Sequence, residues 1–272
     1  MSAHLTSQLF LVGAGKMGGA LLEGWVEQGI EPEQVTVLDP ALGTGSGALI
    51  QERRITINPD LEAQDNAEVI VLAVKPQVMD QVLPSLLPLV HDGVLVISIA
   101  AGISLDFLAR HLGEETAIVR AMPNTPAAVG AGMSVAVPNG HVSPKQKELA
   151  GMLLNAVGEV DWIDDELQMD AVTAVSGSGP AYVFLLVECM AAAGRKLGLE
   201  PELAMRIARQ TVIGSGELMR RSPAEAAVLR KDVTSPGGTT EAALKVLMDE
   251  AALEKLMGRA IEAAAKRSVE LS

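Results

Sequence analysis

Apolar runs that alternate with amphipathic stretches dominate the first 160 residues. Val, Ile and Leu are concentrated in five runs that predict buried strands: 8–13, 35–39, 69–74, 93–99 and 116–122. Weaker strand patterns lie at 54–57, 133–138 and 157–162, and helical patterns lie at 15–29, 76–90 and 104–111. Continuously apolar strands that alternate with helices are typical of a parallel sheet covered on both faces.

The pattern changes near residues 162–166, after which only helices are expected. They are predicted at 167–175, 180–198, 201–219, 223–230 and 239–269. We therefore expect an α/β domain over 1–163 and an all-α domain over 164–272. The later helices are rich in Ala, Leu and Met around much of their circumference, and a second copy of the chain is the simplest cover for such faces. The sequence thus predicts a homodimer or a dimer-based higher oligomer.

The segment "GAGKMG" places Gly13, Gly15 and Gly18 in a G-x-G-x-x-G pattern between a strand and a helix. Gly13 allows a tight turn, Gly15 lets a pyrophosphate approach the backbone, and Gly18 lets the helix pack close to the sheet. This context predicts a Rossmann-type dinucleotide-binding domain. The contacts expected from this turn come from Gly13, Ala14, Gly15, Lys16, Met17 and Gly18.

The choice between NADH and NADPH stays open. Asp39 ends the second predicted strand, where a carboxylate binds a ribose 2′-hydroxyl and repels a 2′-phosphate, which favours NADH. Arg53 and Arg54 offer an alternative contact for a phosphate, although a solvated helix end is the preferred interpretation of this pair.

Two further loops follow predicted strands, "LAVKPQ" at 72–77 and "AMPNTP" at 121–126. Ligands of open parallel sheets lie beyond the carboxyl ends of the strands, so both loops are expected beside the nicotinamide. For Lys75 a cofactor-positioning role is preferred to a role as catalytic acid. The residues assigned to the cofactor from these loops are Ala73, Val74, Lys75, Pro76 and Asn124.

Two turns of small residues interrupt the helical half. "SGSGPAY" at 176–182 does not match a G-x-S-x-G nucleophile elbow. In "TSPGGTT", the residues from Ser235 to Thr240 precede a helix and leave backbone N–H groups at its positive end, where anions are stabilised. Gly237 and Gly238 permit the backbone to curl around such an anion. A dinucleotide fold together with a helical domain that carries small polar turns is typical of hydride transfer, in which the cofactor supplies the chemistry.

Composition narrows the class of protein. Of the 272 residues 49% are hydrophobic, and the formal net charge of −13 argues against binding to nucleic acid. The single cysteine, Cys189, excludes an internal disulfide and favours the cytoplasm. No apolar run reaches the roughly 18 residues of a membrane span, so no membrane partner is expected. The four histidines lack metal-ligand spacing, and no metal site is expected.

Five motifs together resemble the pyrroline-5-carboxylate reductase family over residues 8 to 269: "FLVGAGKMGGAL", "LAVKPQ", "RAMPNTPAAVGAG", "DAVTAVSGSGPAY" and "DVTSPGGTTEAAL". The resemblance implies hydride transfer from the nicotinamide C4 to the imine carbon of Δ1-pyrroline-5-carboxylate, which gives L-proline. Members of this family commonly use NADPH. The alternatives are an NAD(P)-dependent 3-hydroxy-acid dehydrogenase and a non-catalytic dinucleotide sensor.

The resemblance also implies roles for individual residues. Thr240 matches the active-site threonine that hydrogen-bonds the ring nitrogen or the carboxylate, and Ser235 joins it as a catalytic candidate. Glu166 matches a position close to the cofactor, whereas Asp232 stands where the family often has asparagine, which weakens its assignment. The substrate-binding residues implied are Ser235, Gly237, Gly238, Thr239, Thr240, Ser176 and Ser178.

Overall fold

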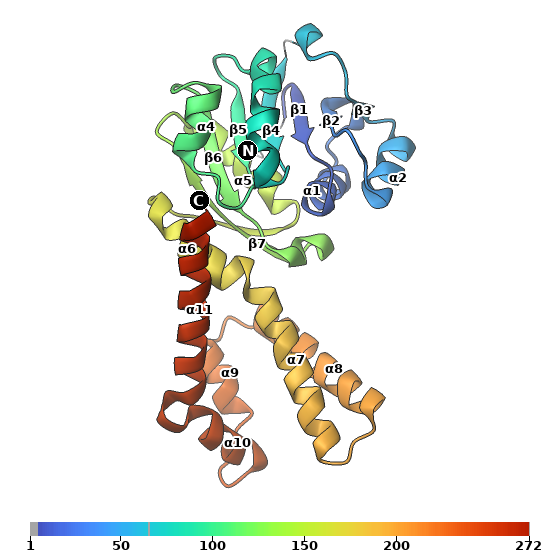
Figure 1. Cartoon of the computed structure of the whole chain (residues 1–272). Helices are drawn as coiled ribbons and strands as arrows, with labels where there is room; N and C mark the ends of the chain where they lie inside the picture. Colours follow the sequence, from blue (N-terminus) through green and yellow to red (C-terminus); the bar gives the residue numbers. More distant parts are fainter. Residues whose placement is uncertain (1–4, 65, 272) are drawn as a thin grey trace. The chain divides into compact units, whose positions relative to one another are not determined.

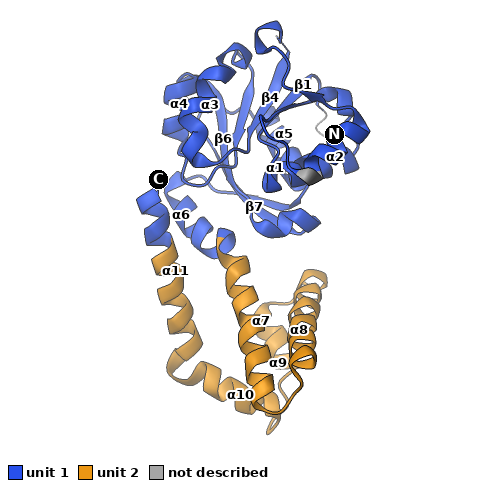
Figure 2. Ribbon diagram, turned by 45° about the vertical axis from the view of Figure 1, so that its right-hand side comes forward, with its two compact units in different colours: residues 1–177, 265–272 blue, residues 178–264 orange. Residues whose placement is uncertain are grey.

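The computed structural model describes residues 5–64 and 66–271 (Figure 1). The chain forms two compact units, which Figure 2 shows in blue and orange. Residues 1–177 and 265–272 make up the first unit, and residues 178–264 make up the second, the helical unit.

The first unit contains a twisted sheet whose strands follow the order β3-β2-β1-β4-β5-β6-β7-β8. The strands are β1 Gln8–Val12, β2 Val35–Leu38, β3 Thr56–Ile57, β4 Ala67–Leu72, β5 Leu95–Ser98, β6 Ala117–Met122, β7 Gly132–Pro138 and β8 Gly158–Trp162. Each predicted strand, weak or strong, is therefore present. The order reverses direction between β1 and β4, which is the switch point where such sheets bind their ligands.

The sheet is not wholly parallel, and that part of the prediction is wrong. Strands β6 and β7 pair antiparallel, whereas the other neighbours are parallel. Only residues 123–131 connect β6 to β7, with a 3₁₀ turn, η5 Thr125–Val129, between them. A parallel crossover needs a dozen or more residues, so this short connection returns the chain in the opposite direction.

Hydrophobic cores cover both faces of the sheet, as predicted. Leu9 and Leu11 of β1 belong to one core and Phe10 belongs to the other, as expected from alternation along a strand. The first core is covered by α1 Lys16–Glu27, α2 Thr44–Arg53 and α5 Pro144–Asn155. The second is covered by α3 Met79–Val82, η4 Leu83–Leu89 and α4 Leu105–Leu112. The indole N–H of buried Trp25 donates to the carbonyl of Leu153 at 2.8 Å and joins α1 to α5.

The single helix predicted over 76–90 is wrong. The segment forms η3 Pro76–Val78, then α3, then the 3₁₀ segment η4. Pro84 and Pro88 lack the N–H that an α-helix needs, so the chain continues in 3₁₀ turns while its leucines still reach the core.

No helix break occurs at "SGSGP", so the predicted interruption there is also wrong. After η6 Glu166–Gln168 and α6 Met169–Val172, the chain forms a π-helical turn, η7 Thr173–Gly177. The backbone stays helical at Ser178, with φ −83° and ψ −21°. A Cβ atom on Gly177 would lie 2.7 Å from the Met122 methyl group, so glycine lets the π turn pack against the end of β6.

The helical unit contains α7 Gly179–Lys196, α8 Pro201–Arg221, α9 Ala226–Asp232 and α10 Thr239–Met248, followed by η8 Asp249–Ala251 and most of α11 Ala252–Leu271. Helices α7 and α8 form a small core of Ala191, Ala204 and Ala208. The single helix predicted over 239–269 is wrong, because Glu250 and Ala251 adopt φ values of 46° and 58°. This left-handed conformation cannot continue a right-handed helix, so α10 ends and α11 begins.

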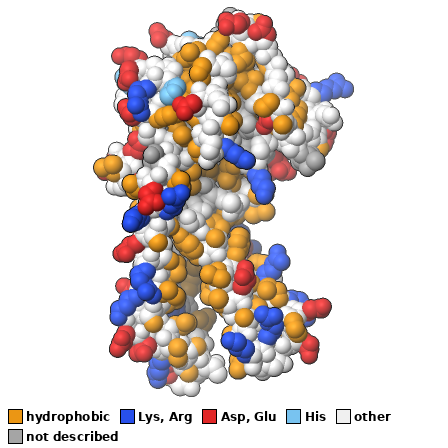
Figure 3. All heavy atoms as spheres, in the orientation of Figure 1, with side chains coloured by type: hydrophobic (Ala, Val, Ile, Leu, Met, Phe, Trp, Pro, Cys, Tyr) orange, Lys and Arg blue, Asp and Glu red, His pale blue; other side chains and the backbone are white. Residues whose placement is uncertain are grey.

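Large apolar side chains remain exposed on the helical unit, whose surface carries many hydrophobic atoms in Figure 3. On α7, Phe184, Leu185 and Leu186 are 62%, 58% and 52% exposed. Among the described residues, one helical segment, Glu166–Lys196, is long and apolar enough to cross a membrane, by length and composition alone. Only 11% of its apolar window is buried within the chain. Because consecutive residues of an α-helix point to different sides, α7 exposes apolar side chains around much of its circumference, and apolar surface of this extent marks a site of contact with another molecule.

Candidate active site

The turn from Gly13 to Gly18, here called the glycine turn, lies at the carboxyl end of β1. Gly13 has φ +94°, and its N–H donates to the carbonyl of Leu38 at 2.8 Å. A Cβ atom there would approach the carbonyl oxygen of Ala73 to 2.9 Å. Gly13 thus lets the ends of β1, β2 and β4 meet without a side chain between them.

The second and third glycines have opposite surroundings. A Cβ atom on Gly15 would meet no heavy atom within 4 Å, so the backbone at the start of α1 is open to a ligand. A Cβ atom on Gly18 would lie 2.0 Å from the carbonyl oxygen of Gly13, so only glycine permits this packing of helix on turn. No side chain caps α1 at Gly15. Free N–H groups at an open helix start fit a pyrophosphate.

A cavity of about 540 Å³ borders this helix start. Gly15 and the exposed Lys16 line it from α1, and Gly43 and Ser46 line it from the start of α2. The Ser46 hydroxyl donates to the carbonyl of Ala14 at 2.7 Å, which ties α2 to the glycine turn. The predicted contact Met17 is half-buried against the core of the sheet.

Asp39 directly follows β2 and is held in place by backbone N–H groups. One carboxylate oxygen accepts from the N–H of Ala14 at 2.7 Å, and the other accepts from the N–H of Ala41 at 2.8 Å. The Asn58 side chain accepts from the N–H of Asp39 and donates to its carbonyl. The negative charge is therefore fixed beside the glycine turn, where sequence reasoning expected it.

Arg53 and Arg54 lie at the other end of α2 from Ser46. The ten residues of this helix span about 15 Å at 1.5 Å per residue. Arg53 lies 3.6 Å from the Glu52 carboxylate. Neither arginine lines the cavity, whose last lining residue on α2 is Leu49, one helical turn before Arg53.

The loops after β4 and β6 lie at the same sheet edge as the glycine turn, since β1, β4, β5 and β6 run parallel. The N–H of Ala73 donates to the carbonyl of Val12 at 2.8 Å, and Lys75, exposed, precedes η3 at Pro76. Val74 packs against the second core. The four residues assigned here thus form one rim of this edge.

The side chain of Asn124 connects three elements. Its carbonyl oxygen accepts from the N–H of Met133 at 2.9 Å, at the start of β7. Its amide group donates to the Ser176 hydroxyl at 3.2 Å, in the π-helical turn. The structure therefore brings two predicted site residues, Asn124 and Ser176, into direct contact, and the amide orients the serine.

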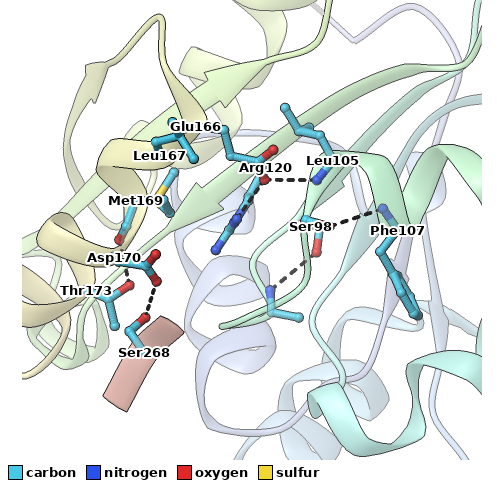
Figure 4. A network of polar contacts seen from close by, with 12 residues as sticks. Ser98, Leu105, Phe107, Arg120, Glu166, Leu167, Met169, Asp170, Thr173 and Ser268 are labelled. Carbon is cyan, nitrogen blue, oxygen red and sulfur yellow. Dashed lines mark hydrogen bonds and ion pairs between the residues drawn. The ribbon is translucent and has the colours of Figure 1, made fainter. Parts of the chain in front are cut away.

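An ion pair missed by sequence reasoning lies between β6 and η6. The Arg120 guanidinium donates to the Glu166 carboxylate at 2.6 Å, and the N–H of Leu105 donates to the same oxygen at 2.9 Å (Figure 4). The side chains are 8% and 27% exposed. The one sequence signal was an arginine inside the apolar run "TAIVRAM". Glu166 thus joins α4, β6 and η6, and its predicted contact with the cofactor stays a prediction.

A second bond in Figure 4 fixes the end of the chain to the first unit. The Ser268 hydroxyl of α11 donates to the Asp170 carboxylate of α6 at 2.6 Å.

No group of three or more His, Cys, Asp or Glu side chains able to hold a metal ion is present in the described part of the chain.

In the helical unit, residues 235–240 form the turn that leads into α10, here called the 235–240 loop. The N–H of Gly238 donates to the carbonyl of Ser235 at 3.0 Å, and Gly237 has φ +72°. Proline at the second position and a left-handed glycine at the third are typical of a type II turn. No side chain caps α10 at Gly238, and Ser178 occupies the corresponding position before α7. The loop therefore presents backbone donors at an exposed helix start.

The fold and the glycine turn define the class of protein: a nicotinamide dinucleotide-dependent oxidoreductase with a Rossmann-type domain and a helical domain. Residues 8–102 match the family described as NADP oxidoreductase, coenzyme F420-dependent. Residues 166–271 match the family described as pyrroline-5-carboxylate reductase dimerisation.

Relatives extend over nearly the whole chain. A pyrroline-5-carboxylate reductase of Pseudomonas aeruginosa is 44% identical over 98% of this chain and 97% of its own. The structure of a pyrroline-5-carboxylate reductase from Coxiella burnetii matches with a TM-score of 0.92 and 37% identity, covering 98% of this chain and 99% of that one. A Plasmodium falciparum reductase with NADP bound matches with a TM-score of 0.80 and 32% identity, covering 98% of each chain.

The chain belongs to the pyrroline-5-carboxylate reductase family. The predicted family, the two-part fold and the NAD(P)H-dependent reduction of Δ1-pyrroline-5-carboxylate are confirmed, and the two alternative functions are not favoured.

The ion pair leads to a stability prediction. Replacing Glu166 with Ala leaves the buried Arg120 charge unpaired, so we expect the free energy of unfolding of the first unit to fall by about 2–4 kcal/mol. Glu166→Gln keeps an acceptor for the N–H of Leu105 and is expected to cost less. Urea unfolding followed by tryptophan fluorescence reports the difference, because Trp25 lies in the core of this unit. Equal stability of wild type and Glu166→Ala would contradict this role.

Proposed function

We propose that the 235–240 loop binds the carboxylate of Δ1-pyrroline-5-carboxylate while the glycine turn binds the dinucleotide. The observation that carries the proposal is the start of α10 at Gly238, which has glycine in place of a capping side chain, as do the starts of α1 at Gly15 and α2 at Gly43 beside the cavity. The helix end carries about half a positive charge, which suits the pyrophosphate at α1 and the substrate carboxylate at α10.

The proposal assigns a task to each group of residues. Backbone groups from Gly13 to Gly18 hold the pyrophosphate, and the loop from Ala73 to Pro76 holds the nicotinamide. Asn124 orients Ser176 through the hydrogen bond described above. When bound, the reduced nicotinamide supplies the hydride that the imine carbon accepts.

At the substrate, Ser235, Gly237, Gly238 and Thr239 contact the carboxylate, and the Thr240 hydroxyl contacts the ring nitrogen. The imine must be protonated for hydride transfer to proceed. The substrate either binds as the iminium ion or receives a proton relayed by Thr240 or by water. Ser178 extends this set of polar groups at the start of α7.

We further propose that NADH is preferred to NADPH. Asp39 fixes a carboxylate beside the glycine turn, and residues 40–47 contain no Lys or Arg to balance a 2′-phosphate. Arg53 and Arg54 lie at the C-terminal end of α2, and neither lines the cavity. Exposed Lys16 lines the cavity, but it lies at the helix start that is proposed to bind the pyrophosphate, so we do not assign it to a 2′-phosphate.

Self-association completes the proposal. The match to the dimerisation family indicates association of this chain with itself, and we propose a homodimer formed through the exposed apolar face of α7. Burial of these apolar side chains between two subunits would explain the apolar segment Glu166–Lys196 without a membrane.

Location in the cytoplasm is also part of the proposal, and the exposed free thiol of Cys189 suits a reducing compartment.

The first test concerns the catalytic threonine. Thr240→Val preserves shape and removes the hydroxyl, so we expect kcat/KM for Δ1-pyrroline-5-carboxylate to fall by roughly 10- to 1,000-fold, or about 1.4–4 kcal/mol. Thr234→Val is the matched control, because the Thr234 hydroxyl already donates to the carbonyl of Arg230 at 2.6 Å. Oxidation of NADH and NADPH at 340 nm measures both variants. Equal rates for Thr240→Val and wild type would mean that this hydroxyl has no part in the reaction.

The second test concerns cofactor choice. Asp39→Asn removes the charge while keeping one acceptor, so we expect the ratio of kcat/KM for NADH to that for NADPH to fall by about 10- to 100-fold. Asp60→Asn, which alters another carboxylate bonded to a backbone N–H, serves as the control. Wild-type preference for NADPH, or an unchanged ratio in Asp39→Asn, would refute the assignment.

The third test concerns association. Phe184→Glu places a charge on the apolar face of α7, where burial of an unpaired charge opposes assembly. We expect sedimentation equilibrium to shift toward the mass of one chain, 28.4 kDa. Leu87→Glu adds the same charge at a 48% exposed site of the first unit and is expected to leave the mass unchanged. An assembled Phe184→Glu variant would place the interface elsewhere.

A further inference from the structure

A carboxylate of the chain itself already contacts the 235–240 loop. The N–H of Gly237 donates to a Glu241 side-chain oxygen at 2.7 Å. Glu241 lies in the first turn of α10, so its charge is stabilised by the same helix end that is proposed to attract the substrate. One of the loop's backbone donors is thus bonded to an internal anion.

Two further backbone donors of this helix start are open. The backbone N–H groups of Thr239 and Thr240 have no hydrogen-bond acceptor among the described residues, because the first intrahelical bond at this end is donated by Ala242 to Gly238. A substrate carboxylate that uses these groups comes within a few ångströms of the Glu241 carboxylate.

The charge on Glu241 is not balanced by a neighbour. Within residues 5–64 and 66–271 it takes part in no ion pair, although Lys245 lies one turn further along α10. Like charges at short range repel each other, and partial exposure reduces the repulsion without abolishing it.

We propose that Glu241 is a specificity-determining residue that competes with the substrate carboxylate for the Gly237 N–H. This inference rests on the proposed binding of that carboxylate at the 235–240 loop. Glu241 holds the loop in its donor-presenting curl before the substrate arrives, and its carboxylate yields when the substrate binds. Because L-proline retains the same carboxylate, Glu241 weakens the binding of product as well as substrate and favours product release.

Glu241→Gln separates charge from hydrogen bonding, because the amide oxygen still accepts from the Gly237 N–H. We expect its KM for Δ1-pyrroline-5-carboxylate to fall by about 3- to 30-fold. The rate constant of the hydride-transfer step and the KM for the dinucleotide are expected to stay unchanged. The comparison substrate is 1-pyrroline, which has the same ring and imine and no carboxylate. Its kcat/KM is expected to be the same in wild type and variant.

Glu254→Gln is the matched control, because Glu254 is an exposed glutamate in the first turn of the next helix, α11. Glu254→Gln is expected to leave the KM and kcat/KM of both substrates unchanged. Titration of L-proline into the dinucleotide complex, measured by calorimetry, should show tighter binding in Glu241→Gln than in wild type.

An unchanged or raised KM for Δ1-pyrroline-5-carboxylate in Glu241→Gln would overturn the inference. An equal gain for 1-pyrroline would overturn it as well, because the effect would not depend on the substrate carboxylate. If the wild type does not favour Δ1-pyrroline-5-carboxylate over 1-pyrroline, carboxylate binding at the 235–240 loop fails, and the role of Glu241 fails with it.

Discussion

The proposed binding of dinucleotide and substrate depends on one interaction, the hydrogen bonds that backbone N–H groups at helix starts donate to anions. Helices α4 and α5 have side-chain caps: the Ser104 hydroxyl oxygen accepts from the N–H of Phe107, and Ser143 forms a capping box with Gln146. Helices α1, α2 and α10 begin with glycine and have no side-chain cap. The contrast separates helix starts whose N–H groups a capping side chain satisfies from those that keep N–H groups open to an anion, although Glu241 already accepts from the Gly237 N–H before α10.

The glycines and their neighbours make these open helix starts possible. The buried Gly18 lets α1 approach the carbonyl of Gly13, and Asp39 and Ser46 then fix the turn through bonds to Ala14. Ordinary hydrophobic packing on both faces of the sheet supports this arrangement. In the helical unit, a turn with a left-handed Gly237 plays the comparable part. Local backbone geometry, supported by a conventional core, therefore precedes any side-chain chemistry.

Much of this could be predicted from sequence, because the signals are local. Apolar runs located the strands, and the spacing of three glycines after a strand located the turn. The features that were not predicted depend on connection lengths, backbone conformations and long-range contacts, which local sequence patterns do not encode. The antiparallel pairing of β7 follows from the length of a connection, and the bend at Glu250 involves left-handed residues that are neither glycine nor asparagine. The pair of Arg120 and Glu166 joins residues 46 positions apart, so no short motif announces it.

The same reasoning explains why the site was only partly foreseen. Motif resemblance indicated which segments matter, yet it could not show that Asn124 bonds to Ser176 or that Glu241 bonds to Gly237. Both contacts depend on side-chain rotamers set by the folded backbone. These two contacts show that residues of the proposed site also act on one another: Asn124 orients Ser176, and Glu241 occupies the N–H of Gly237.

The central claim is that backbone donors of the 235–240 loop bind the substrate carboxylate. Nuclear magnetic resonance of protein labelled with ¹⁵N at glycine and threonine, titrated with L-proline in the presence of oxidised dinucleotide, tests it most directly. The account predicts that the amide resonances of Gly237, Thr239 and Thr240 shift most within the helical unit, with the saturation expected for one site. Shifts confined to other amides, with these three unchanged at saturating L-proline, would contradict it.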